Sequence, residues 1–249
     1  PGAWGTNINL PLLPGTGDEG LHRLYDGLIS HILEDFKPEL IINSAGQDNH
    51  FSDPLASMAV TAQGYARLAD KLQADIAVLE GGYSVESALP YVNTGIILAM
   101  AGMDYSKVLE PDMSQLRKQD PRCNKRVDQL IEQVGDLYFN RERTKKELLQ
   151  KCNGVWQRKK HIYYDEEGIR EQQLETVRYC SICDGYFTIQ TAAEDTRFGD
   201  QSAFIVCLPR DICPNCRQRA YDEALREKKT GRWQYVFVQQ IVDGFIETI

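Results

Sequence analysis

Hydrophobic and polar residues alternate along the first hundred positions in two patterns. Apolar residues recur at helical spacing over residues 18–36, behind an acidic first turn, and over 61–72, where Thr61 is placed to cap the helix. Short apolar runs at 39–42 and 75–83 end in small and polar residues, as expected of buried strands. Strands that alternate with helices at this spacing indicate parallel βαβ units, so we expect an α/β fold with a doubly wound sheet.

The pattern changes after residue 105. Residues 106–123 hold two prolines and no sustained periodicity, which is typical of a linker. Helical spacing follows, then short strands around one further helix, and Asp243-Gly244 between two apolar runs indicates a hairpin. We therefore predict an α/β domain over 1–105, a linker over 106–123 and an α+β domain over 124–249.

Length and the lack of long apolar runs narrow the class of protein. At 249 residues the chain has room for one or two domains. It has no apolar run near the roughly 20 residues that span a bilayer and no basic-then-apolar leader, so we expect a cytoplasmic protein without a membrane partner. It begins at Pro1 in a loop-like segment, which suggests a fragment.

The net charge of −8 is unevenly distributed. Residues 1–110 carry 5 Lys and Arg against 14 Asp and Glu, and the remainder is close to neutral. Neither part has the basic stripe that binding of a phosphate backbone requires, so a nucleic acid partner is unlikely on this pattern. The local RKKH run at residues 158–161 leaves room for a small basic patch.

Polar residues gather where both predicted strands end. SAGQDNHFSDP (residues 44–54) follows the first strand, and EGGY (80–83) ends the second. Ligands of open parallel sheets sit at the carboxyl ends of the strands. Asp48 offers a hard oxygen ligand there, and the Tyr83 hydroxyl can donate to a developing oxyanion. An aspartate after a strand more often makes a turn or a helix cap, so the pattern alone leaves a metal site open.

Several motifs together resemble the C-terminal half of the histone deacetylase and acetylpolyamine amidohydrolase superfamily, namely NLPLLPGTGDEG, FKPELIINSAGQDNHFSDPLASM, TAQGYARL and LEGGYS. The resemblance implies an arginase-like α/β fold and zinc-dependent hydrolysis of an acetylated amine or acetyl-lysine. It implies that Asp48 is the last of three zinc ligands and that Tyr83 polarises the scissile carbonyl. Gly81 and Gly82 would line the substrate tunnel, and the EGGY form with Glu80 is closer to class II and bacterial members.

The same resemblance shows what the sequence lacks. In the family an earlier Asp-x-His pair completes the zinc site, and an adjacent pair of histidines activates the water. The chain has no adjacent pair among its four histidines, His22, His31, His50 and His161. Asp48-Asn49-His50 spells Asp-x-His, but its setting between SAG and DPL is not that of the earlier motif. We therefore expect an incomplete catalytic zinc site and no activity from this chain alone.

The neighbours of Asp48 carry expectations of their own. We expect His50 to support the site or to lie at its rim, and Asp53 to hold the loop by turn hydrogen bonds. Gln47 stands where class II members commonly have Phe, which puts the acyl-group preference in doubt. His22 and His31 lie on the first predicted helix, where packing or surface roles are expected.

Four of the seven cysteines form two CxxC pairs, Cys180-Cys183 and Cys213-Cys216, separated by 29 residues. Two such pairs brought together make a tetrahedral site of four thiolates, a common structural zinc arrangement. A redox dithiol and incidental thiols are the alternatives. Cys207 lies on an apolar strand and is expected to be buried without a metal. A closed site has no open coordination position, so this zinc should hold a zinc-ribbon-like fold and do no chemistry.

Two functions fit these patterns. The first is a zinc-dependent deacetylase-type amidohydrolase, present here without its N-terminal half. The alternative is a catalytically silent deacetylase-like scaffold whose zinc ribbon binds a protein or nucleic acid partner. A His-His pair and an Asp-x-His in sequence upstream of Pro1 would favour the enzyme.

Overall fold

The computed structural model describes residues 5–111, 113–116, 118–183, 185–195, 197, 199–241 and 244–249 of the chain. They form two compact units, Gly5–Phe139 and Asn140–Ile249. No helix in the described part of the chain is both long and apolar enough to cross a bilayer.

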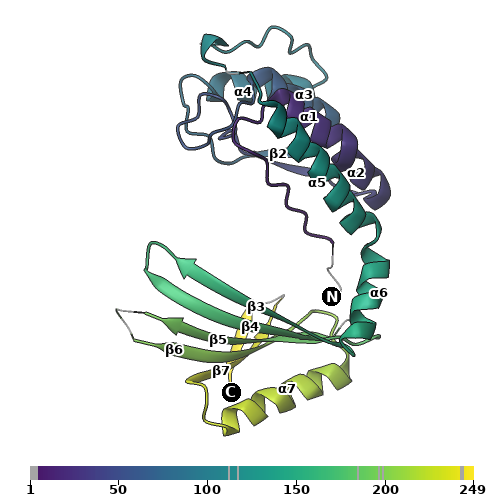
Figure 1. Cartoon of the computed structure of the whole chain (residues 1–249), viewed down its shortest axis with the longest axis vertical. Coiled ribbons are helices and arrows are strands. Elements are labelled where there is room, and N and C mark those ends of the chain that lie inside the picture. The colour runs from purple at the N-terminus through teal and green to yellow at the C-terminus, as the bar shows by residue number, and fades with distance from the viewer. Residues whose placement is uncertain are drawn as a thin grey trace. The chain divides into compact units, whose positions relative to one another are not determined.

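The first unit is an α/β structure (Figure 1). Its elements are α1 (Asp18–Leu24), the π turn η1 (Tyr25–Ile29), α2 (Ser30–Phe36), β1 (Ile42–Ala45), α3 (Ala62–Leu72), β2 (Ile76–Leu79), α4 (Leu89–Met100), the 3-10 turn η2 (Met113–Gln115) and α5 (Pro121–Phe139). β1 and β2 pair in parallel, and α3 connects them, so the predicted βαβ unit is confirmed. The Gly64 N–H donates to the Thr61 hydroxyl at 3.1 Å, which confirms Thr61 as the cap of α3.

Helices α3 and α4 pack closely in the core of this unit. A Cβ added at Gly95 would lie 3.1 Å from the Ala66 Cβ and 3.3 Å from the Ala62 carbonyl oxygen, so glycine permits the approach. Val92 and Ile96 fill the space beside it. The same cluster includes Ala45 of β1 and Ala77 of β2, so the two helices pack against the strands.

Strands β1 and β2 remain largely uncovered. Ile42 is 57% exposed and Leu79 is 68% exposed, although parallel sheets are normally buried on both faces. Leu40, Ile76 and Val78 are also exposed. Within the described residues, the predicted doubly wound sheet is therefore represented by two parallel strands with an open apolar surface.

The helix α5 belongs to the first unit. Its Val127 and Leu130 pack against Leu24 and Leu28 of the first helical segment in a buried cluster. The compact unit therefore ends at Phe139, whereas the sequence analysis places 106–123 as a linker and begins the second domain at 124. The two divisions differ because the apolar face of α5 is buried against residues about one hundred positions earlier, a contact that local periodicity does not show.

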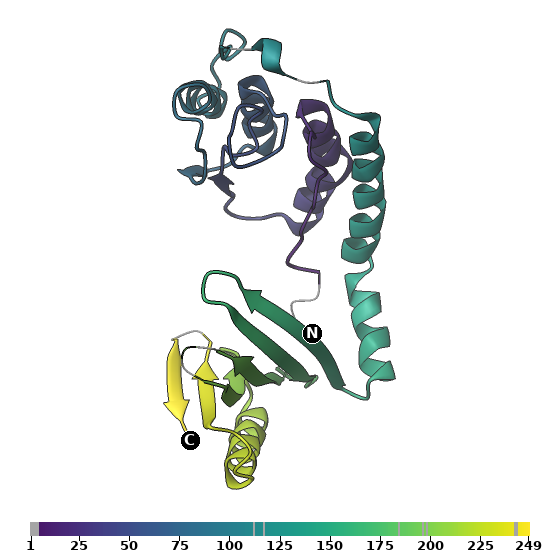
Figure 2. The ribbon, with the colours of Figure 1, turned by 60° about the vertical axis from the view of Figure 1, so that its left-hand side comes forward.

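The second unit contains α6 (Arg141–Lys151), β3 (Val155–Tyr164), β4 (Ile169–Arg178), β5 (Tyr186–Glu194), β6 (Gln201–Leu208), α7 (Pro214–Lys229), β7 (Tyr235–Gln240) and β8 (Phe245–Thr248). Its sheet has the order β3-β4-β5-β6-β7-β8, in which only β6 and β7 pair in parallel. The helix α7 connects those two strands and packs on one face of the sheet (Figures 1 and 2). The expected α+β arrangement is confirmed.

The core under α7 consists of alternate residues of the central strands. Phe204, Val206, Val236 and Val238 are buried there together with Ala220 of the helix. β7 and β8 form the predicted antiparallel pair. Of the hairpin signal, Gly244 lies in the turn, and Asp243 lies outside the described residues.

Candidate functional site

Two loops meet where β1 and β2 end, which we call the Asp48 loop (residues 46–54) and the Tyr83 loop (residues 80–88). The Gln47 N–H donates to the Gly81 carbonyl oxygen at 2.5 Å. The parallel register of the strands, which pairs Ala45 with Leu79, sets both loops at the same edge. The predicted site residues therefore fall on two segments that are hydrogen-bonded to each other.

The Asp48 carboxylate and the Tyr83 hydroxyl converge over Gly81. A Cβ added at Gly81 would lie 3.3 Å from Asp48 Oδ2 and 3.4 Å from Tyr83 Oη. Glycine leaves that space free, and the side chain of Tyr83 is 53% exposed. The structure thus brings together an accessible hydroxyl donor and a carboxylate around an open position on the backbone.

Gly82 serves the contact between the two loops. A Cβ there would lie 2.9 Å from the Gln47 Cβ, which is closer than real side chains approach. Gln47 is buried, and its amide nitrogen donates to Asn93 Oδ1 on α4. In the described residues its Oε1 has no hydrogen-bond partner. Gln47 therefore packs between Gly82 and α4, where it supports the loop from behind.

His50 is fully buried and both ring nitrogens are engaged. Its Nδ1 lies 2.9 Å from the Ser52 hydroxyl, and its Nε2 lies 3.3 Å from Glu110 Oε1. The Glu110 carboxylate also accepts the Ala62 N–H at 2.9 Å, at the start of α3. His50 consequently supports the loop from the interior; the alternative position at the rim is excluded by its burial.

The electrostatics of this pair follow from its hydrogen bonds. Burial alone would raise the pKa of Glu110, but hydrogen bonds from His50 and from the Ala62 N–H outweigh it and hold the pKa below the usual value. Glu110 therefore carries its charge near neutral pH. Sequence reasoning did not find Glu110, because it lies 60 residues from His50 outside every quoted motif.

Asp53 makes the turn bonds expected of it and one more. Its Oδ1 accepts the Leu55 N–H at 2.9 Å, which confirms the predicted turn. Its Oδ2 accepts the Tyr83 N–H at 2.7 Å. Asp53 thus fixes the backbone of the residue whose hydroxyl faces Asp48.

The described residues do not form a complete metal site around Asp48. A catalytic zinc takes three protein ligands and a water. Within the described part of the chain, metal-ligating side chains gather in a group of three or more at the four cysteines of the second unit, and not around Asp48. His22 is buried on α1, and burial lowers its pKa. His31 is exposed on α2. These positions agree with the packing role and the surface role expected of the two histidines. Further ligands at Asp48 would have to come from other residues.

Residues 2–99 match the histone deacetylase domain. A probable deacetylase of Archaeoglobus fulgidus is 52% identical over 117 residues, which cover 43% of this chain and 33% of the relative. Histone deacetylase 14, chloroplastic, of Arabidopsis thaliana is 37% identical over 92 residues, 33% of this chain and 22% of the relative. The acetoin utilization protein AcuC of Bacillus subtilis is 29% identical over 144 residues, 54% and 37% of the two chains.

The resemblance to deacetylases and amidohydrolases is confirmed by these matches. The matched part of this chain spans only about a fifth to just over a third of these relatives. A solved structure, the HDA15 HD domain, aligns with a TM-score of 0.45 at 22% identity over 59% of this chain and 39% of that chain. Asp48, Gly81, Gly82 and Tyr83 all lie within the part that matches the histone deacetylase domain.

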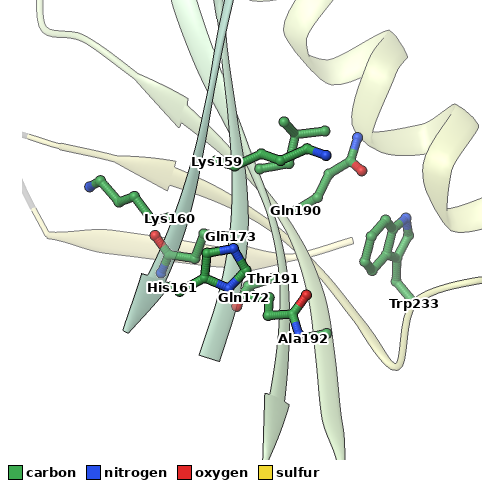
Figure 3. A pocket seen from close by; sticks show the side chains of 10 residues that line it. Lys159, Lys160, His161, Gln172, Gln173, Gln190, Thr191, Ala192 and Trp233 are labelled. Atoms are coloured by element: carbon green, nitrogen blue, oxygen red, sulfur yellow. The ribbon is translucent and has the colours of Figure 1, made fainter. Parts of the chain in front are cut away.

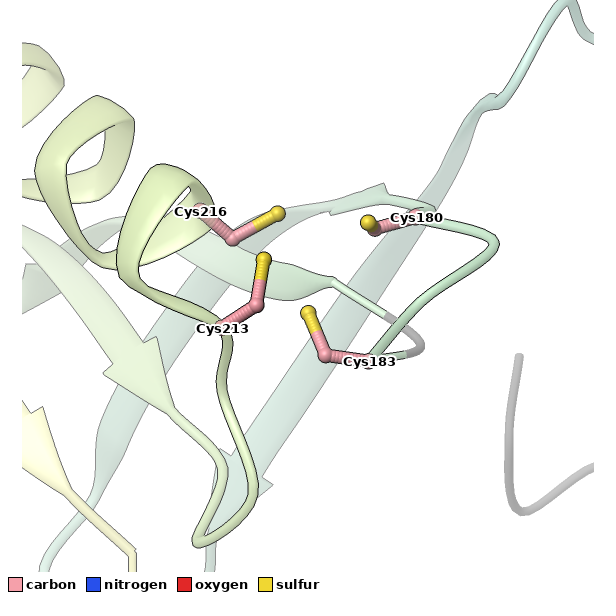
Figure 4. Close-up of side chains that lie close together, drawn as sticks. All are labelled: Cys180, Cys183, Cys213 and Cys216. Atoms are coloured by element: carbon pink, nitrogen blue, oxygen red, sulfur yellow. The ribbon is translucent and has the colours of Figure 1, made fainter.

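The second unit carries the cysteine cluster outside that domain (Figure 4). The sulfur atoms of Cys180, Cys183, Cys213 and Cys216 all lie within 4.8 Å of one another. The first two follow β4, and the last two lie at the start of α7. Four sulfurs at this spacing can hold a metal ion in a tetrahedral site, as the two CxxC pairs predict.

Backbone N–H groups prepare two of these sulfurs to act as thiolates. The Ile182 N–H donates to Cys180 Sγ at 3.5 Å, and with the Cys183 N–H it lowers the pKa of Cys180 to about 7. The pKa of Cys213 is lowered chiefly by the Cys216 N–H. Cys216 is buried, and burial raises its pKa. A bound cation would offset that cost, because metals bind the deprotonated form.

Glycine shapes the turn around the first pair. Gly185 has φ 90°, and a Cβ there would lie 1.7 Å from the Arg178 carbonyl oxygen. The chain can therefore reverse tightly between β4 and β5 with Cys180 and Cys183 at the bend. Cys207 is buried on β6, away from this group, and burial raises its pKa to about 12, which confirms it as a small buried side chain.

A shallow depression of about 320 Å³ lies on the sheet of the second unit (Figure 3). Lys159, His161, Gln172, Gln190 and Trp233 are among its lining residues, and no acidic side chain lines it. It combines lysine amines, amides and one imidazole with an indole ring, and among the described residues no group of three or more metal-binding side chains lies there. We assign no reaction to it.

Proposed function

We propose that the first unit supplies part of the active site of a zinc-dependent, deacetylase-type amidohydrolase that cleaves acetyl amides. The observation that carries this proposal is the convergence of the Asp48 carboxylate and the Tyr83 hydroxyl over Gly81, inside the region that matches the histone deacetylase domain. Acetyl-lysine and acetylated polyamines are the substrate classes that the resemblance implies.

Each residue has a distinct role in this proposal. Asp48 is one carboxylate ligand of the catalytic zinc. Tyr83 donates its hydroxyl to the carbonyl oxygen of the substrate, whose negative charge grows as the amide is attacked. Gly81 keeps the space between these two groups clear, and Asp53 holds the Tyr83 backbone so that the hydroxyl is oriented before the substrate arrives.

We further propose that the missing ligands and the residues that activate water belong to a preceding half of the deacetylase domain. The open surface of β1 and β2 supports this, because further parallel strands and the helices that connect them would cover the exposed side chains of Ile42 and Leu79. The described residues supply too few ligands for a catalytic zinc, so the chain by itself should be inactive.

In the second unit we propose a structural zinc bound by Cys180, Cys183, Cys213 and Cys216. The mutual distances of the sulfurs and the N–H groups directed at Cys180 support it. Four thiolates fill the coordination sphere, so this zinc would stabilise a zinc-ribbon-like fold and have no position for substrate.

The function is tested by steady-state hydrolysis of an acetyl-lysine peptide and of an acetylated polyamine. We expect no turnover by the 249-residue chain and turnover by a polypeptide that adds the preceding half of the domain. Turnover that requires Tyr83 in that longer protein supports the proposal. Hydrolysis by the short chain at an ordinary enzymatic rate, or none by the longer protein on either substrate, contradicts it.

A further inference from the structure

Four side chains behind Tyr83 form a continuous hydrogen-bonded series that begins at its neighbour Ser84. The hydroxyl oxygens of Ser84 and Ser52 lie 2.8 Å apart. The Ser52 hydroxyl lies 2.9 Å from His50 Nδ1, and His50 Nε2 lies 3.3 Å from Glu110 Oε1. The series therefore runs from the Tyr83 loop through the Asp48 loop to Glu110, which in turn accepts the Ala62 N–H of α3.

The backbone N–H of Ser52 determines the direction of these hydrogen bonds. The Ser52 N–H also points at His50 Nδ1, at 3.2 Å, and a backbone N–H can only donate, so Nδ1 is the acceptor. His50 Nε2 then carries the proton and donates to the ionised Glu110. The Ser52 hydroxyl donates to Nδ1, which leaves its lone pairs to accept from Ser84. Every hydroxyl and ring N–H in the series thus points from Ser84 toward Glu110.

Such a directed series constrains geometry in a way that apolar packing does not. Bonds aligned head to tail polarise one another and fix angles as well as distances. The inner end of the series is secured, because His50 and Glu110 are both buried. A packing role alone would be met by any side chains of similar volume, whereas here two hydroxyls meet across the gap between the loops.

The series complements two backbone contacts on the same loops. The Gly81 carbonyl oxygen accepts a hydrogen bond from the Gln47 N–H, and the Tyr83 N–H donates one to Asp53 Oδ2. Ser84 adds the third tie, on the other side of Tyr83 from Gly81. The exposed ring of Tyr83 thus depends for its position on a backbone that is held on both sides.

We propose that Ser84, Ser52 and His50, anchored by Glu110, are positioning residues that keep the Tyr83 hydroxyl beside the Asp48 carboxylate. Ser84 belongs to the Tyr83 loop, so a displacement of that loop would first lengthen its hydrogen bond with Ser52. Glu110 connects the other end of the series to α3 through the Ala62 N–H. The chemical role of Tyr83 rests on the proposed function, but its position can be measured without substrate.

The experiment uses the whole chain labelled with 3-fluorotyrosine. Tyr83→Phe assigns the Tyr83 signal in the fluorine NMR spectrum, and hydrogen exchange reports the protection of the Tyr83 N–H. The variants are Ser84→Ala, Ser52→Ala, the double variant and Ser84→Thr, which retains a hydroxyl. Ser57→Ala is the matched control, because Ser57 is an exposed serine of the segment that follows the Asp48 loop. Circular dichroism and the melting temperature verify that each variant is folded.

We expect either alanine variant to shift or broaden the Tyr83 signal and to speed exchange of its N–H by about tenfold, the scale of one lost hydrogen bond. The double variant should behave like either single variant, because both remove the same contact. Ser84→Thr should restore the signal, and Ser57→Ala should leave it unchanged.

An unchanged signal and unchanged exchange in both folded alanine variants would overturn the proposal. Equal changes at Tyr83 and throughout the chain would also overturn it, since they would indicate a general loss of stability. A failure of the proposed function would instead appear as an unaltered kcat in Tyr83→Phe of the longer protein, so the two ideas fail separately.

Discussion

The backbone N–H of Tyr83 donates to Oδ2 of Asp53 at 2.7 Å, across 30 residues of sequence. The same carboxylate makes the turn that holds the Asp48 loop, through the Leu55 N–H. One buried side chain therefore sets the backbone of both loops at the ends of β1 and β2. This explains how a carboxylate and a phenol hydroxyl stay together on an edge that no further strand covers among the described residues.

Tyr83→Phe should lower kcat of the longer, active protein by about 10² to 10³ and change KM little. The hydroxyl interacts more strongly with the oxyanion than with the neutral carbonyl, so its loss falls on the transition state. Steady-state kinetics with an acetyl-lysine peptide measures both constants. Tyr163→Phe is the control, because Tyr163 is 59% exposed and lies in the second unit. An unaltered kcat would remove Tyr83 from the mechanism.

Gly81→Ala should leave the first unit folded but separate the Asp48 carboxylate from the Tyr83 hydroxyl. The new methyl would meet atoms of both groups at 3.3 and 3.4 Å, and the exposed tyrosine is the easier one to move. We expect a loss of kcat comparable with that of Tyr83→Phe and no added loss when the two changes are combined. Gly135→Ala is the control, because its methyl makes an ordinary contact at 3.5 Å. Additive losses would show that Gly81 acts independently of Tyr83.

Glu110→Gln should lower the free energy of unfolding by about 1–2 kcal/mol at pH 7, because a neutral amide replaces a charged acceptor of two hydrogen bonds. Its pKa is lower in the folded than in the unfolded protein. The stabilisation is therefore present above the unfolded pKa and is lost as the pH falls through the folded pKa. The difference between wild type and variant should shrink with acidification, as urea unfolding from pH 7 to pH 3 will measure. A difference in unfolding free energy that stays constant with pH would contradict the role of Glu110 as a charged hydrogen-bond acceptor.

Zinc analysis of the purified chain should find one ion, and Cys183→Ser or Cys216→Ser should release it. Hydrogen exchange should then rise across β4, β5 and α7, because the metal joins the turn between β4 and β5 to the start of α7, while α3 and α4 keep their protection. Cys207→Ser should retain zinc, since that sulfur lies outside the cluster. Asp48→Ala should also retain it. Zinc lost from Cys207→Ser but kept in Cys216→Ser would refute the ligand set.

Local patterns in the sequence predicted most of the elements and both groups of candidate residues. Helical spacing located the first helical segment and α3, and a short apolar run located β2. The first strand was predicted three residues too early, at 39–42, because its apolar run ends where β1 (Ile42–Ala45) begins. The CxxC pairs predicted the cysteine cluster, because each pair places its two sulfurs near each other through local geometry alone. Asp48 and Tyr83 could be paired before the structure was known, since parallel strands present their carboxyl ends at one edge.

Tertiary structure alone decided the contacts between residues far apart in the chain. The bond of His50 to Glu110, the burial of Gln47 against Asn93 and the packing of α5 on α1 each join segments with no shared periodicity. Hydrophobic patterning specifies which face of an element is buried, but not which distant surface buries it. Shape and hydrogen-bond satisfaction make that choice only when the chain is packed, so the support of Tyr83 became visible only in three dimensions.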